Sequence, residues 1–325
     1  MEQSVSALFA RYLTCSQLTE SSVAIKQRAL EHFLFLCGDR NVGDISYELG
    51  EDYRNGLYNT LSVMGREPAK VRQSVNIYLT NFKAFVSWLA KRHLIQFHVW
   101  REVRAFTVDE ARVRPYTAAE IARILRIADT RWRAMVLLGL MSMRRAEILN
   151  LVVRDIHFDR NYIQIAPKKD TATTWRWSIK NHQQALVPLA PVIETIDETI
   201  DLHALLIELI EWLPERQPYV FLRPDTYKTL WDKKQKGELT WQERNNPWGN
   251  FSRDFRNLLG RAAVELRRFH DLRATFATKM GETLPLRKIQ RLMRHSSPQT
   301  TARYIHVDEQ KLVAESAKLC EKCYA

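Results

Sequence analysis

The sequence predicts a mainly α-helical fold with a small antiparallel β-sheet, divided into two domains. A chain of 325 residues exceeds the usual size of one domain, which favours two. Only 10 residues are Gly and turn dipeptides are few, so long helices are favoured over a β architecture with many turns. With 46% hydrophobic and 26% charged residues, the composition excludes a disordered or low-complexity chain.

Residues 5–103 are predicted to form several amphipathic helices. Apolar residues recur at helical spacing in SSVAIKQRALEHFLFLCGD, whose start Ser21 or Ser22 can cap. A second helix is predicted through AKVRQSVNIYLTNFKAFVSWLAKRHLI. Its apolar stripe, interpreted as core, consists of Val71, Val75, Tyr78, Leu79, Phe82, Phe85, Val86 and Leu89.

The polar, charged residues 104–115 end in a proline, which is typical of an exposed linker. We therefore expect one domain over 1–103, a linker over 104–115 and a second domain over 116–325. The second domain begins with a helix that Thr117 caps, with Glu120 completing a capping box.

The second domain then changes from a helical to a strand pattern. RWRAMVLLGLMSMRRAEILNL predicts a buried helix, a turn at Met141 and Ser142, and a second helix. The segments IHFDRNYIQIAPKK, TTWRWSIK and QALVPL alternate or are rich in β-forming residues, which predicts a small antiparallel sheet. The following pattern is helical, interrupted by the polar residues 225–250, which we interpret as a surface loop or insertion.

The charge balance favours a polyanionic partner. The net charge is +12, and residues 111–325 carry 36 basic against 25 acidic side chains, so this part holds +11 of it. Such a field attracts nucleic acid, although many basic proteins bind no nucleic acid specifically.

Four scattered cysteines, Cys15, Cys37, Cys320 and Cys323, do not form a disulfide framework and fit a reducing compartment. The last two have a zinc-like spacing without a second Cys or His pair, so we expect two tail thiols, no metal and no cofactor. The chain starts without a basic and apolar leader and holds no run of ~18 apolar residues. We therefore expect a cytoplasmic protein that is neither secreted nor membrane-spanning.

The segment RRFHDLRATFATKM places His270 and Arg273 three residues apart, and therefore on one face of a predicted helix. A guanidinium grips two phosphate oxygens, and an imidazole can move a proton at neutral pH. The pair is a candidate phosphate site, although such pairs also occur on solvated helix faces.

A second candidate lies in RKIQRLMRHSSPQTTARYIHV. Ser297 can cap a helix that starts at Pro298, which places Tyr304 about two turns into it and His295 just before the cap. A tyrosine hydroxyl, with its ordinary pKa near 10, becomes nucleophilic only beside cations or a base. In isolation Tyr304 is better interpreted as an ordinary half-buried aromatic than as a nucleophile.

Together these residues resemble a known family. HDLRATFAT and HSSPQTTARYIHV are similar to the two C-terminal motifs of the tyrosine recombinases, or phage integrase family, including the step from His295 to Tyr304. MRRAEILNL resembles the family's first Arg motif, whose Arg stands three residues before a Glu. This selects Arg144 over Arg145, with Glu147 as its helix partner.

The family's Lys precedes a Val-Pro-Leu-like strand by seven positions, which selects Lys180 over Lys168 and Lys169. The interval from Arg144 to Lys180 looks like a longer hairpin than usual. Arg294 stands where the family usually has Gly before the His, and an Arg would strain the turn if this position takes a positive φ.

The resemblance implies a two-domain DNA clamp: a helical, SAM-like core-binding domain followed by an α+β catalytic domain. It implies that tyrosine attacks a DNA phosphorus and forms a 3′-phosphotyrosyl bond without ATP or metal. The two Arg stabilise the transition state, the Lys protonates the leaving 5′ oxygen, and the two His share proton transfer and phosphate binding in an order left open. The implied catalytic residues are Arg144, Lys180, His270, Arg273, His295 and Tyr304.

The implied partners are double-stranded DNA and further copies of the chain, as a homodimer on a core site and a homotetramer in the synapse. An accessory DNA-bending protein is compatible with the resemblance, whereas a membrane is not expected, so the protein would be associated with the nucleoid. Two alternatives remain: relaxation of DNA in the manner of a type IB topoisomerase, and DNA binding on the same fold without catalysis. The target sequence, and the choice among integration, excision and dimer resolution, stay open.

Overall fold

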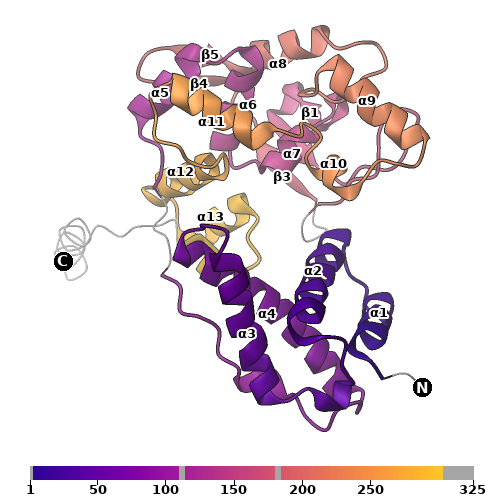
Figure 1. Cartoon of the computed structure of the whole chain (residues 1–325). Coiled ribbons are helices and arrows are strands. Elements are labelled where there is room, and N and C mark those ends of the chain that lie inside the picture. Colours follow the sequence, from indigo (N-terminus) through magenta and orange to yellow (C-terminus); the bar gives the residue numbers. More distant parts are fainter. Residues whose placement is uncertain (1–2, 110–113, 180–183, 303–325) are drawn as a thin grey trace, which may run out of the picture. The chain divides into compact units, whose positions relative to one another are not determined.

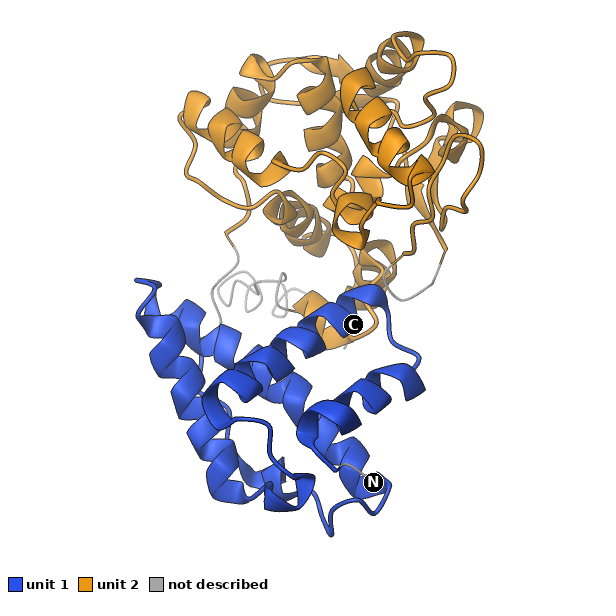
Figure 2. Cartoon of the chain, turned by 45° about the vertical axis from the view of Figure 1, so that its right-hand side comes forward, with its two compact units in different colours: residues 1–111 blue, residues 112–325 orange. Residues whose placement is uncertain are grey.

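The computed structural model describes residues 3–109, 114–179 and 184–302. Figure 2 shows two compact units, residues 1–111 and residues 112–325, which we call unit 1 and unit 2. Each unit has its own hydrophobic core. The predicted mainly helical fold with small antiparallel sheets is confirmed.

The regular elements described in unit 1 are all helices (Figure 1), and Ser4 forms an isolated β-bridge with Asn41. Its helices are α1 (Val5–Cys15), α2 (Glu20–Cys37), the 3₁₀ turn η1 (Val42–Asp44), α3 (Tyr47–Ser62), α4 (Pro68–Lys91) and the 3₁₀ turn η2 (Val99–Glu102).

Aromatic side chains fill the core of unit 1. The rings of Phe33 and Phe82 stack with centroids 4.4 Å apart, and the ring of Trp100 lies 4.9 Å from that of Phe82. The buried hydroxyl of Tyr53 donates to the Ala29 carbonyl at 2.8 Å, so its polar end is satisfied. The predicted apolar stripe of α4 is confirmed as core, with only Tyr78 left partly exposed.

The predicted cap of α2 is wrong. Thr19 caps this helix: its backbone is extended and its Oγ1 accepts from the Ser22 amide at 3.3 Å. The hydroxyls of Ser21 and Ser22 bond to Thr19 Oγ1 instead. Three hydroxyl residues follow one another closely here, and spacing alone does not say which of them leaves the helix.

The described residues of the predicted linker, 104–109 and 114–115, form no helix or strand. Asn76 exchanges two hydrogen bonds with the backbone of Phe106, each 2.8 Å long. Arg54 donates to the Arg104 carbonyl at 3.0 Å. Residues 104–106 therefore pack with unit 1.

Unit 2 combines helices with two small sheets. The helices are α5 (Ala118–Ile127), α6 (Thr130–Leu140), α7 (Arg145–Leu149), α8 (Leu202–Glu211), α9 (Pro224–Gln235), α10 (Trp241–Asn245), α11 (Phe251–Arg261), α12 (His270–Gly281), α13 (Leu286–Met293) and α14 (Pro298–Ala302). The strands are β1 (Ile156–His157), β2 (Tyr162–Ile165), β3 (Ala185–Pro188), β4 (Val192–Glu194) and β5 (Thr199–Asp201), with 3₁₀ turns η3 (Val153–Asp155) and η4 (Phe158–Arg160) beside β1. The capping box of Thr117 and Glu120 at the start of α5 is confirmed.

The main sheet has the order β1–β2–β3 and is antiparallel throughout, with Ile163 opposite Val187. Strands β4 and β5 form a separate antiparallel pair. The predicted strand in TTWRWSIK is wrong, because there Trp177 makes only an isolated bridge with Lys168. The alternating pattern of this segment reflects the burial of Trp175 and Trp177. The ring of Trp175 stacks on that of Tyr219, with centroids 4.1 Å apart.

The loop predicted over residues 225–250 is also wrong, because this segment holds most of α9 and all of α10 (Figure 1). Pro224 starts α9 in the position where its fixed φ suits a helix, and a capping box of Thr240 and Glu243 starts α10. Few residues of these helices are buried, so their hydrophobic periodicity is too weak to reveal them.

A close helix crossing fixes the position of α12. A Cβ atom on Gly139 of α6 would lie 3.0 Å from the Leu272 side chain and 3.2 Å from that of Phe269, so any other residue there would push these side chains aside by a few tenths of an ångström. The predicted turn follows directly, with Met141 ending α6 and Ser142 at φ 72°. This turn and α12 are two of the segments that form the site described next.

None of the helices in the described residues has both the length and the apolar composition that a membrane span requires. No group of three or more His, Cys, Asp or Glu side chains in those residues is arranged to hold a metal ion.

Candidate functional site

Cationic and imidazole side chains from three segments of unit 2 converge: the turn before α7, the start of α12 and the turn after α13. Four predicted site residues are among them: Arg144, His270, Arg273 and His295. They lie close enough that the charges of both arginines affect the pKa of both histidines. We call these four the cationic cluster. The other two, Lys180 and Tyr304, lie outside the described residues.

Arg273 is the most deeply buried member, with 1% of its surface exposed. Helix α12 carries it, as predicted, one turn after His270. Its Nη1 donates to the carbonyl oxygen of Ser142, which ties α12 to the turn after α6. The guanidinium is thus fixed before any ligand arrives.

Arg144 is the N-cap residue of α7. Its Nη1 donates to Glu147 Oε1 at 2.7 Å, and its backbone amide donates to Glu147 Oε2 at 2.8 Å. The neighbouring Arg145 is directed elsewhere: it donates to Ser252 Oγ at 3.1 Å and lies 5.8 Å from the ring centroid of Phe251. Of the two arginines, only Arg144 bonds to Glu147 in the described contacts.

His295 follows α13 in a turn that holds it from both sides. Its amide donates to the Gln290 carbonyl at 3.1 Å, and Gln290 Nε2 donates to the His295 carbonyl at 3.1 Å. On the ring, Nδ1 is 2.9 Å from Thr301 Oγ1. Helix α14 begins at Pro298, as predicted, and supplies this threonine.

Both imidazoles are neutral at pH 7. Desolvation, reinforced by the positive charge of Arg273, lowers the pKa of His270 to about 4. Desolvation, followed by the charges of Arg273 and Arg144, likewise lowers the pKa of His295 to about 4. A neutral ring can accept a proton with one nitrogen and donate a hydrogen bond with the other.

The backbone of Arg294 is left-handed, with φ 52° and ψ 45°. This conformation is strained for an arginine, as expected from the sequence. Its side chain returns toward α7, where Nη2 lies 2.7 Å from Glu147 Oε2 and 2.9 Å from the Ser142 carbonyl oxygen. Sequence reasoning noticed Arg294 only as a departure from a motif and missed Ser142 as the shared acceptor. A positive φ at a serine leaves no signal in the sequence.

The two lysines set aside in favour of Lys180 lie in different environments. Lys168 is buried, with its Nζ 2.6 Å from Asp155 Oδ2, and the two side chains are 3% and 7% exposed. Lys169 is exposed. Lys168 is therefore committed to an ion pair inside unit 2.

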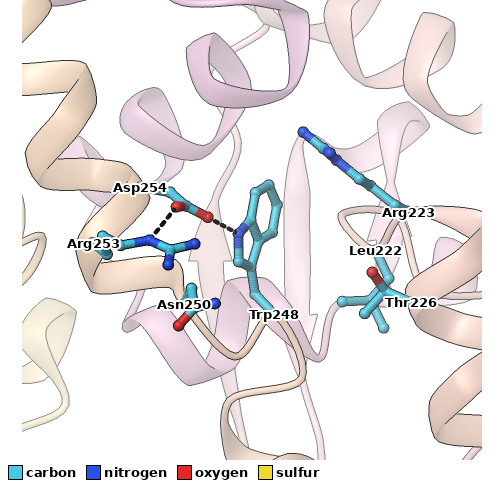
Figure 3. A pocket seen from close by; sticks show the side chains of 7 residues that line it. All are labelled: Leu222, Arg223, Thr226, Trp248, Asn250, Arg253 and Asp254. Atoms are coloured by element: carbon cyan, nitrogen blue, oxygen red, sulfur yellow. Dashed lines mark hydrogen bonds and ion pairs between the residues drawn. The ribbon is translucent and has the colours of Figure 1, made fainter.

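A separate pocket of about 180 Å³ lies between the starts of α9 and α11 (Figure 3). Within it, Trp248 Nε1 donates to Asp254 Oδ2 at 2.9 Å, and Arg253 pairs with the same carboxylate at 3.3 Å. None of the four described site residues lines this pocket.

Comparison with known proteins identifies the fold and the family. Residues 115–311, more than half of the chain, match the Phage integrase family. The chain belongs to the phage integrase family. The match covers the whole cationic cluster and the positions of Lys180 and Tyr304.

A relative in the phage integrase family is the tyrosine recombinase XerC-like protein of Caldanaerobacter subterraneus subsp. tengcongensis. It is 24% identical over 258 residues, which span 77% of this chain and 65% of that protein, just under two thirds of its length.

Two solved structures share the fold. The Tn1549 transposon integrase in complex with circular intermediate DNA has 14% sequence identity and a TM-score of 0.67, over 97% of this chain and 99% of that one. The lambda integrase dimer bound to a COC′ core site has 15% identity and a TM-score of 0.63, over 93% of this chain and 77% of that one.

Proposed function

We propose that this phage integrase family member is a site-specific recombinase that cuts and rejoins double-stranded DNA through a covalent tyrosine intermediate. One observation carries the proposal: two guanidiniums and two neutral imidazoles, from segments distant in the sequence, meet at one place in unit 2. Such a cluster suits a phosphodiester, whose charge the arginines bind and whose proton transfers the imidazoles can serve.

In the proposed reaction the hydroxyl oxygen of Tyr304 attacks a backbone phosphorus, and the bond from phosphorus to the 5′ oxygen breaks. The tyrosine proton passes to a neutral imidazole, and Lys180 gives a proton to the departing 5′ oxygen. Attack by a 5′ hydroxyl on the 3′-phosphotyrosyl bond reverses these steps. Because the broken ester is replaced by another ester, ATP is not required.

The residues of the cationic cluster would act on the pentacoordinate transition state. Arg144 and Arg273 would stabilise the charge on its non-bridging oxygens, and fixed donors of this kind contribute several kcal/mol. His295 is held at Nδ1 by Thr301, so Nε2 would serve the phosphate. His270 would then take the tyrosine proton, although the two imidazoles can exchange these roles.

Lys180 remains the proposed general acid. The commitment of Lys168 to Asp155 supports this choice, because a general acid must reach the leaving oxygen. Lys169 is exposed and stays the alternative.

We further propose that two copies of the chain bind a core site and four form the synapse, in integration or excision of a mobile element. Support comes from the solved integrases of the same fold, which include a dimer on a core site and a tetramer bound to a Holliday junction. The helical unit 1 would be the core-binding domain and unit 2 the catalytic domain.

A nicked suicide duplex tests the proposal. The duplex sequence is selected for binding to the full chain from a random library, and a nick is placed at each position in turn. We expect a covalent protein–DNA adduct with the wild type, also in chelator, and none with Tyr304→Phe. Specific binding without an adduct would overturn the proposal in favour of DNA binding without catalysis, and plasmid relaxation without strand exchange would favour a topoisomerase.

A further inference from the structure

The residue before His295 has an unfavourable backbone. Arg294 lies in the left-handed region, where an L-residue with a Cβ atom is strained and glycine is not. Ser142, which its side chain contacts, also has a positive φ, of 72°. Strained residues that contact each other beside a polar site persist only where surrounding interactions hold them.

The Arg294 side chain supplies such interactions. Its guanidinium bonds to Glu147 Oε2 at 2.7 Å, and the side chains of Arg294 and Glu147 are 12% and 3% exposed. The same nitrogen, Nη2, donates to the Ser142 carbonyl oxygen, which also accepts from Arg273. Charge-assisted bonds in a buried setting are among the stronger hydrogen bonds of proteins.

Arg294 also contacts Arg144 through its backbone. Arg144 Nη2 donates to the Arg294 carbonyl oxygen at 3.1 Å, while Arg144 Nη1 donates to Glu147 Oε1. Arg144, Glu147 and Arg294 therefore form a closed ring of hydrogen bonds. A shift of the turn at Arg294 would displace Arg144 and His295 together.

The ring of hydrogen bonds also determines the net positive charge that a nearby phosphate would experience. With Glu147 alone, the charge of Arg144 would be cancelled by its partner. Arg294 adds a second cation to the same carboxylate, so the three side chains together carry one net positive charge. The Coulomb attraction of a nearby phosphate is larger for this group than for a neutral pair.

We propose that Arg294 is a positioning residue, which neutralises Glu147 and holds Arg144 and His295 so that the charge of Arg144 acts on the DNA phosphate. The inference rests on the proposed recombinase function.

The test compares single-turnover cleavage of the selected suicide duplex at saturating DNA. We expect Arg294→Gly to lower the cleavage rate at least tenfold, and Arg294→Lys, which keeps the charge, to recover part of the loss. The dissociation constant for the same duplex, measured in the Tyr304→Phe background, should change less than threefold. Ala263→Gly is the control, since it relieves another positive φ, of 50°, at an exposed site.

A second comparison separates positioning from a general structural role. In a Glu147→Gln background no carboxylate charge is left to neutralise, so Arg294→Gly should lower the rate at least threefold less than it does in the wild type. An equal loss in both backgrounds, or a wild-type rate in Arg294→Gly, overturns the inference. If Arg294→Gly shows no cooperative thermal transition, Arg294→Gln, which removes the charge and keeps most of the side chain, carries the same comparison in the two backgrounds.

Failure of the proposed function has a different signature. A wild type that forms no adduct with any nicked duplex refutes the recombinase proposal, and this inference with it. A wild type that cleaves normally, with an Arg294→Gly variant that cleaves equally well, refutes this inference alone.

Discussion

At the scale of single residues, the protonation state of the two histidines decides what the cationic cluster can do. Desolvation and neighbouring arginines lower both pKa values to about 4, which leaves neutral rings beside permanently charged guanidiniums. The two kinds of side chain therefore have different roles: the arginines supply positive charge, and the imidazoles can accept a proton. A tyrosine hydroxyl, with its high ordinary pKa, becomes nucleophilic beside cations or a base, and the cluster offers both.

The pH dependence of cleavage tests this protonation state. At subsaturating DNA, the rate reports the ionisation of the free protein. Because the folded pKa values lie below the ordinary 6.5, the neutral form persists as pH falls through 6, and we expect the acid limb below pH 5. An acid limb centred near pH 6.5, absent from His270→Gln, would show that His270 is not desolvated.

Arg273 provides the second prediction at this scale. Replacing it with Ala removes the buried guanidinium that we propose stabilises the transition state, and we expect cleavage to slow by about 10²–10³-fold at saturating DNA. Arg273→Lys should remain at least tenfold below wild type, because an ammonium lacks the two-pronged geometry. Arg160→Ala, at an arginine that is 70% exposed, is the control. A rate within threefold of wild type for Arg273→Ala would contradict the assigned role.

At the scale of elements, helices with strong apolar stripes could be predicted and surface helices could not. The stripe of α4 is core, whereas α9 has a single buried residue, Leu230, and its sequence pattern predicts a loop. In the site, likewise, contacts within one helix could be predicted from the sequence and contacts between distant segments could not. His270 and Arg273 share a helix, so their proximity follows from spacing, while the bonds from Arg294 to Glu147 and Ser142 depend on how distant segments pack.

Lys168, which lies between β2 and β3, forms a buried ion pair with Asp155 at the end of η3, and this pair yields a third prediction. Lys168→Met leaves the Asp155 carboxylate buried without its cation, so we expect the free energy of unfolding to fall by about 3 kcal/mol in urea titrations. Adding Asp155→Asn should restore most of that loss. No destabilisation by Lys168→Met would mean that the pair is open to water.

The same variant distinguishes the candidate general acids. Below its unfolding transition, Lys168→Met should cleave the suicide duplex within threefold of wild type, whereas Lys180→Ala should be severely impaired. The reverse result would move the general acid from Lys180 to Lys168.

At the scale of the whole molecule, the charge distribution predicts strongly salt-dependent DNA binding. Residues 111–325 carry +11 of the net +12, and each phosphate contact releases a bound counterion. If about six phosphates are contacted, affinity should fall about 10³-fold between roughly 50 and 200 mM salt. Titration of a labelled duplex with the Tyr304→Phe variant measures the slope, and an affinity independent of salt would contradict binding through this basic unit.

The central proposal is that the Tyr304 hydroxyl is the nucleophile and that the cationic cluster assists its attack. Its most direct test is to trap the covalent complex, digest protein and DNA, and locate the attached nucleotide by mass spectrometry. The account predicts a nucleotide linked through its 3′ phosphate to Tyr304. A nucleotide on another residue, or a linkage through the 5′ phosphate, would contradict it.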